Sequence, residues 1–162
     1  MNKQDIFTLY KYNQWANKKI LESARNVTQE QYLAEASFPH GGLHSTLTHI
    51  LFAEWIWRSR WEGTSPTTRF KPNEFPTLDS LLQRWQEEEH RLMGFVEELT
   101  DERLALPFHY RNTKGVPKEN ILWHSMAHVV NHGTQHRSEA AAMLTAFGCS
   151  PGDLDMIYFL GS

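Results

Sequence analysis

Apolar side chains recur at steps of three and four residues in several long segments of this chain, and this spacing is the period of an α-helix. In residues 5–24 the repeating face consists of Ile6, Leu9, Asn13, Ala16 and Ile20. Residues 45–61 repeat the pattern with His49, Phe52, Ala53 and Ile56, and Gly63 follows as a helix stop. Segments of this kind predict amphipathic helices that bury one face against each other.

The third helical segment begins after Thr77, a residue type suited to an N-cap, and its apolar stripe runs to Leu99. The stripe has a gap at Glu88 and Glu89, which stand between Trp85 and Leu92. Either one of these carboxylates points into the interior or the helix turns this edge to solvent. The position in the apolar stripe favours the first reading and the rarity of a buried glutamate without a partner favours the second, so the sequence leaves both open.

The connections are short and rich in turn residues. Residues 62–76 carry Gly63 and three prolines among serines and threonines, which predicts a loop. Between 104 and 119, Pro107-Phe-His-Tyr followed by Asn112-Thr-Lys-Gly115 predicts a short β-hairpin. A fourth helix is expected over residues 120–147, ending before Gly148. We therefore expect one all-α domain over residues 1–162, a four-helix bundle of up-and-down or crossover type with a hairpin between its third and fourth helices.

Composition excludes several classes of protein. The net charge is −3 and no block of Lys or Arg stands out, which argues against nucleic-acid binding. No apolar stretch is long enough for a membrane span, and the N-terminus lacks the basic start and apolar run of a signal peptide. Cys149 is the only cysteine, so an internal disulfide is excluded. A cytoplasmic location is the expectation.

The fourth predicted helix carries a histidine at every fourth position, namely His124, His128, His132 and His136. Four residues advance about 400° around a helix, so each ring lies nearly above the last with a drift of roughly 40°. Because the ladder continues the apolar stripe of this helix, we expect its rings to face inward. Buried imidazoles need hydrogen-bond or metal partners, and neighbours in such a ladder can chelate one ion.

Spacing alone leaves the chelating pair open, since His128 with His132 and His132 with His136 are equivalent. His49, in the core phase of the second helix, is a candidate third ligand. The sequence His132-Gly-Thr-Gln-His136 places Gly133 where the HExxH motif of zinc proteases has its catalytic glutamate. A mechanism of the zinc-protease type is therefore unsupported.

Three motifs together resemble the DinB/YfiT-like family over nearly the whole chain. They are Tyr12-Asn-Gln-Trp-Ala-Asn17, Leu47-Thr-His-Ile-Leu51 with the trailing Trp55 and Trp57, and Asn131-His-Gly-Thr-Gln-His-Arg137. The resemblance implies a four-helix bundle whose metal, often nickel or zinc, is held here by His49, His132 and His136, and it favours a homodimer. The chain departs from the family at Ser138 and Glu139, where Gly and Gln are usual.

Three imidazole ligands would leave coordination positions open, as in catalytic metal sites, so that a bound water or thiol is activated. The resemblance implies transfer of a low-molecular-weight thiol, such as bacillithiol or mycothiol, to an electrophile. Our first hypothesis is thus a metal-dependent transferase in which Arg137 or Glu54 orients a small-molecule substrate. The alternatives are a metal-dependent hydrolase with Glu88 or Glu89 as general base, and a stress-induced metal-binding protein without turnover.

The remaining histidines and aspartates receive simpler interpretations. His124 and His128 are either pocket residues or ordinary structural ones. His40 and His44 are expected to be loop residues, with the lining of a pocket mouth as the alternative, and His90 is expected to face solvent. Asp155 is interpreted as a turn residue that could also accept a hydrogen bond from a ligand imidazole.

Overall fold

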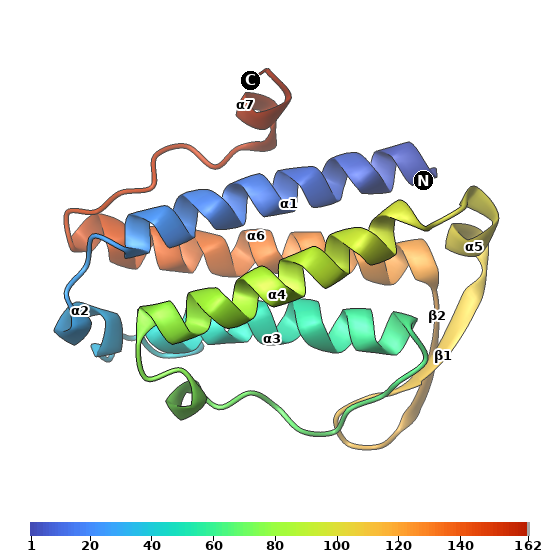
Figure 1. Cartoon of the computed structure of the whole chain (residues 1–162), viewed down its shortest axis with the longest axis horizontal. Coiled ribbons are helices and arrows are strands. Elements are labelled where there is room, and N and C mark those ends of the chain that lie inside the picture. Colours follow the sequence, from blue (N-terminus) through green and yellow to red (C-terminus); the bar gives the residue numbers. More distant parts are fainter. Residues whose placement is uncertain (162) are drawn as a thin grey trace.

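Four long helices lie side by side along the computed structural model, which describes residues 1–161 (Figure 1). They are α1 (Lys3–Ala24), α3 (Leu43–Trp61), α4 (Leu78–Glu97) and α6 (Leu122–Ala146). The shorter elements are α2 (Gln29–Leu33), the 3-10 turn η1 (Pro72–Glu74), α5 (Asp101–Ala105) and α7 (Met156–Leu160). The expected all-α bundle is confirmed, and each long helix begins and ends within a few residues of its expected boundary.

Side-chain caps fix where the helices begin. Asn2 accepts a hydrogen bond from the backbone N–H of Asp5, and the Asp5 carboxylate accepts one from the backbone of Asn2. Thr77 caps α4 through Ser80 in the same way, as expected from the sequence. These bonds satisfy N–H groups that have no partner inside the helix.

The connections make this a crossover bundle. After α3 the chain returns along the length of the bundle through residues 62–77, so α4 runs in the same direction as α3 (Figure 1). The predicted hairpin is present between α5 and α6, with β1 (Pro107–Arg111) antiparallel to β2 (Pro117–Ile121). Gly115 adopts a φ of 77° in its loop, where a residue with a side chain would be strained. Within residues 1–161, no helix is both long and apolar enough to cross a membrane.

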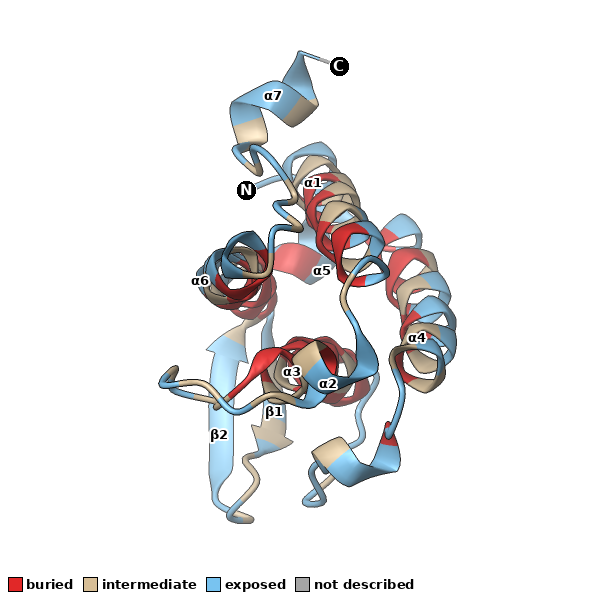
Figure 2. Ribbon diagram, turned by 90° about the vertical axis from the view of Figure 1, so that its left-hand side faces the viewer, coloured by how far each residue is buried: buried red, intermediate tan, exposed pale blue. Residues whose placement is uncertain are grey.

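Buried faces of the four long helices turn toward one another (Figure 2). The apolar core forms two clusters, one around Tyr10, Trp61 and Met126 and the other around Ile20, Leu47 and Leu144. The helices carry buried polar side chains in their middle turns, between the positions that supply these two clusters: Asn13, Asn17, Glu54, Arg58, Glu88 and Arg137. A polar layer therefore divides the apolar core.

Candidate metal centre

Four imidazole rings gather between α3 and α6. His49 projects from α3, His132 and His136 from α6, and His40 from the loop before α3. The ring centroid of His49 lies 4.8 Å from that of His132 and 4.7 Å from that of His136. The ring of His40 stacks on that of His49, with the two centroids 3.6 Å apart. One nitrogen each of His40, His49 and His136 lies within 4.8 Å of the other two. His49 and His136 thus belong both to this triplet and to the one expected from sequence.

The spacing of the nitrogens fits metal coordination. The Nε2 atoms of His49 and His132 are 3.0 Å apart. Two nitrogens that bind one zinc ion at about 2.0–2.1 Å with a bond angle near 90–110° lie about 2.9–3.4 Å from each other. The two rings come from separate helices and already have the separation of neighbouring ligands.

The same rings are held in the neutral form that binds metals. Burial, together with the neighbouring imidazoles, lowers the pKa of His49 to about 3 and that of His132 to about 4. The buried Nδ1 of His132 has no hydrogen-bond partner among the described residues. Buried imidazoles in this condition are unusual without a further partner, and a cation is a partner that suits neutral nitrogen donors.

Glu139 supports the cluster from one turn further along α6. Its Oε2 lies 2.9 Å from Nδ1 of His136, which leaves Nε2 of that ring free. A carboxylate in this position fixes the orientation of the ring and makes it a better ligand. Sequence reasoning noted Glu139 only as a departure from the family, although its spacing of three residues from His136 was the signal for this contact.

The histidine ladder does not face inward along its whole length. His136 is buried and His132 half-buried, but His128 and His124 are exposed, so the expectation that all four rings face the core is wrong for these two. The drift of roughly 40° per step turns the ladder out of the core toward the N-terminus of α6. The ring of His128 packs against Trp57 at 5.5 Å, beside the cluster.

Two candidate substrate-orienting residues lie instead in the polar layer. Glu54 accepts hydrogen bonds from Asn13 and Asn17, and its other oxygen accepts one from the indole of Trp85. Arg137 donates to the oxygens of the same two asparagines. Both charged side chains are buried in this network, and neither lines the cavities beside the histidine cluster.

Glu88 and Glu89 differ in their surroundings. Glu88 is the carboxylate that points inward, and Arg58 donates two hydrogen bonds to it, at 2.5 and 2.9 Å. Glu89 is half-buried and lines a groove between α1 and α4. Neither residue lines the cavities beside the histidine cluster, where a general base for hydrolysis would be needed.

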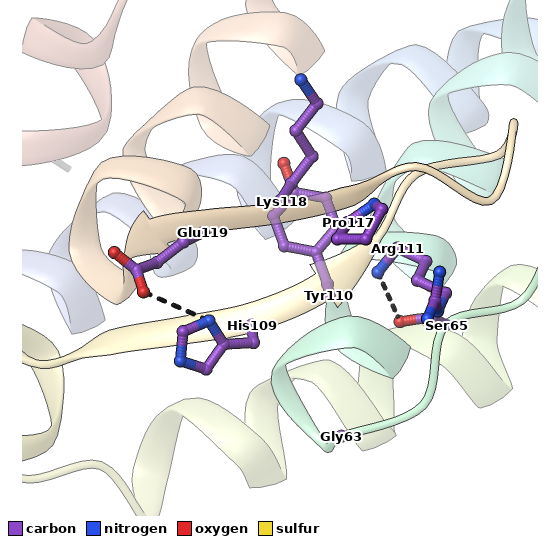
Figure 3. A pocket seen from close by; sticks show the side chains of 8 residues that line it. All are labelled: Gly63, Ser65, His109, Tyr110, Arg111, Pro117, Lys118 and Glu119. Carbon is purple, nitrogen blue, oxygen red and sulfur yellow. Dashed lines mark hydrogen bonds and ion pairs between the residues drawn. The ribbon is translucent and has the colours of Figure 1, made fainter.

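Two cavities adjoin the cluster. One of about 320 Å³ runs from His49 and His132 along α3 to the hairpin. The other, of about 210 Å³, lies between His40, His49 and residues 69–72 of the connection from α3 to α4. A third cavity, of about 680 Å³, opens on the other side of the hairpin around Ser65 and the His109–Glu119 pair (Figure 3). None of the four clustered histidines lines this third cavity.

His40 and Asp155 lie in surroundings that differ from those expected from the sequence. His40 belongs to the cluster and is not an isolated loop residue, because the chain before α3 folds back over His49. Nothing in the sequence signals this, since the loop has no periodic pattern. Asp155 is exposed at the start of α7, and the carboxylate that accepts a hydrogen bond from a cluster histidine is that of Glu139. His90 is exposed, as expected.

Comparison with known proteins gives two matches that extend over the fold and the cluster. A sequence model of the DinB family matches residues 1–161. Protein DinB of Bacillus subtilis (strain 168) is 25% identical over 166 residues, which cover 95% of this chain and 94% of that protein. Both matches include every helix that supplies a histidine to the cluster.

Proposed function

This chain belongs to the DinB family, and we propose that it is a metal-dependent enzyme that transfers a small thiol to an electrophile. The proposal assigns one divalent transition metal, zinc or nickel, to His49, His132 and His136. The observation that carries it is the meeting of neutral imidazoles from α3 and α6, with two Nε2 atoms 3.0 Å apart. His40, stacked on His49 from a loop, is assigned a position at the rim of the site.

The donor set favours a catalytic ion over a structural one. Structural zinc sites are normally closed by four protein ligands, usually including cysteine. Cys149, the only cysteine, lies beyond the end of α6 and is not part of the cluster. When bound, a divalent ion would lower the pKa of a thiol or water in an open coordination position.

The residues around the cluster favour thiol transfer over the two alternatives. A thiolate is a strong nucleophile in its own right, whereas the hydrolase alternative relies on Glu88 or Glu89 as general base. Glu88 is paired with Arg58, and Glu89 lines a separate groove. The cavities beside His49 offer space for a small molecule, which a purely structural metal site would not need.

The test is a transfer assay with matched variants. Protein loaded with zinc or nickel is incubated with a low-molecular-weight thiol and a chromogenic aryl halide as electrophile. We expect a rate above background that is lost in His136→Ala and retained in His124→Ala, whose ring is exposed on the same helix. Equal rates for the protein and for His136→Ala would remove the proposal.

A homodimer is part of this proposal. Support comes from α7, where Ile157, Tyr158 and Leu160 expose 70%, 55% and 56% of their surface. Apolar side chains clustered at one end of a molecule are typical of protein contacts. Light scattering is expected to give twice the chain mass of 18.9 kDa, and a monomer mass at micromolar concentration would contradict this.

A further inference from the structure

Helix α3 carries two buried arginines, of which one forms ion pairs and the other does not. Arg58 and Arg60 are 5% and 6% exposed. Arg58 is paired with Glu88 and Glu62. Arg60, which points to the other side of the helix, forms no ion pair with any described residue, and its buried Nε has no hydrogen-bond partner. A buried charge is normally paired, so Arg60 is the exception that needs an explanation.

Aromatic rings hold the guanidinium of Arg60 in place without neutralising it. The group lies 4.8 Å from the ring centroid of Trp57 and 5.0 Å from that of Tyr110. Such contacts orient a guanidinium and leave its N–H groups available. An oriented, desolvated and unpaired guanidinium is well prepared to bind an anion.

The cavity that Arg60 lines is positively charged. It is the cavity of about 320 Å³ beside the cluster, and Arg69 and Lys118 line it as well. No aspartate or glutamate does so among the described residues. Arg69 also lines the neighbouring cavity at His40 and His49, which has no acidic residue either. Low-dielectric walls lined by one sign of charge attract ligands of the opposite sign.

The hairpin contributes the basic Lys118 to this cavity. Side chains along a strand point to opposite faces, and Tyr110 pairs with Lys118 across the two strands while His109 pairs with Glu119. In Figure 3 the Lys118 side chain extends away from His109 and Glu119. Lys118 and Tyr110 line the cavity beside the cluster as well as the one on the other side of the hairpin, whereas the acidic Glu119 lines only the latter.

The cavity follows one face of α3 from the cluster to Arg60. His49, Ala53, Ile56 and Arg60 line it at helical spacing, and the 11 steps from His49 to Arg60 correspond to about 16 Å along the axis. The geometry points to an extended small molecule with different groups at its two ends.

We propose that this cavity binds a small molecule through a carboxylate or phosphate group, held by Arg60 with Arg69 and Lys118 at the rim. The opposite end of the molecule lies at the histidine cluster. This deepens the proposed function, because it makes the substrate an anion, but the contact between the anion and Arg60 does not depend on thiol chemistry.

The test is calorimetric titration of the full chain with succinate, with inorganic phosphate and with succinamide, the neutral counterpart of succinate. Each titration is run with and without added zinc. We expect succinate or phosphate to bind at least about tenfold more tightly than succinamide, since a charge-assisted pair contributes at least that factor. Whichever anion binds more tightly identifies the group that Arg60 recognises.

Matched variants assign the binding to Arg60. Arg60→Gln and the exposed Arg69→Gln are expected to lose about tenfold or more in anion affinity. Lys118→Gln is expected to lose less, and Lys114→Gln, in the hairpin loop but outside the cavity, is expected to be unchanged. Equal affinity for succinate, phosphate and succinamide, or unchanged anion affinity in Arg60→Gln, would overturn the proposal. Anion binding that needs Arg60 without any thiol transfer would contradict only the proposed function.

Discussion

His124, His128, His132 and His136 have the same spacing along α6 but end in different surroundings. The first two are exposed, the third is half-buried and the fourth is buried. The drift of about 40° per step explains this gradient, because a ladder at four-residue steps turns slowly around a helix of 3.6 residues per turn. At the scale of single residues, burial therefore separates the candidate ligands from their neighbours.

Replacing ligands one at a time tests this separation. His49→Ala and His136→Ala are expected to weaken zinc or nickel binding by at least about 100-fold, more than the loss of a supporting residue costs. His124→Ala is the matched control and should bind as tightly as the unchanged protein, because its ring is exposed. Competition against a chromogenic chelator measures all three. Loss of binding in His124→Ala equal to that in His136→Ala would refute the assignment.

Glu139 gives a second prediction for single residues. Its carboxylate lies 2.9 Å from Nδ1 of His136, so Glu139→Ala should lower metal affinity by about 10–100-fold. Glu139→Gln, which keeps an oxygen acceptor and removes the charge, should lose less. The same competition assay compares them. Affinity unaffected in Glu139→Ala would show that the carboxylate does not support the ring.

Among the elements, the three- and four-residue spacing of apolar side chains was enough to locate the four long helices. The turn residues were enough to locate the hairpin. The helices α2, α5 and α7 have five residues each, too few for a helical period to be recognised. The stacking of His40 on His49 was also not predicted, since it depends on how a loop folds over α3. Sequence reasoning thus identified side chains that helices carry into the cluster and missed the one that a loop brings there.

Gly133 lies where α6 packs closely against α1, whereas Gly94 of α4 faces open space. A Cβ on Gly133 would lie 2.6 Å from an Arg137 guanidinium nitrogen and 3.0 Å from the Asn13 oxygen, whereas a Cβ on Gly94 in α4 meets nothing within 4 Å. Gly133→Ala should therefore destabilise the protein by about 1–3 kcal/mol, since Arg137 is held by its hydrogen bonds.

Gly94→Ala is the control for this pair. It should stabilise the protein by about 0.5–1 kcal/mol, because alanine is the better helix former and space is free. Urea denaturation measures both variants. Stabilisation of similar size by the two substitutions would show that Gly133 is not needed for the close approach of Arg137.

At the scale of the whole molecule, the polar layer links the candidate metal site to the packing of the bundle. Arg137 follows His136 in the chain and anchors α6 to Asn13 and Asn17 of α1, which in turn bind Glu54 of α3. A buried network of this kind favours one alignment of the helices, because sliding any helix would leave a charge unpaired. We infer that it sets the relative heights of the helices that carry the imidazoles.

The network makes stability depend on pH in a defined direction. Burial raises the pKa of Glu54 from 4.5 to about 6, although hydrogen bonds from Asn13 and Asn17 act the other way. The folded-state pKa is the higher one, so the contribution of this group to stability is complete below about pH 4.5 and is lost as the pH rises through about 6.

Comparison with Glu54→Gln isolates that contribution, because other titrating groups are common to both proteins. The free energy of unfolding of the unchanged protein, relative to the variant, should fall by about 2 kcal/mol between pH 4 and pH 8. Urea denaturation at a series of pH values without added metal measures it. A relative stability that stays constant, or that rises with pH, would contradict the direction of the pKa change.

Anomalous X-ray diffraction from crystals of the zinc- or nickel-loaded protein, collected at the absorption edge of the metal, locates the ion among the side chains. We expect one strong peak between α3 and α6, within about 2.0–2.3 Å of a nitrogen of each of His49, His132 and His136. A peak elsewhere in the molecule, or an ion bound without His49, would contradict it.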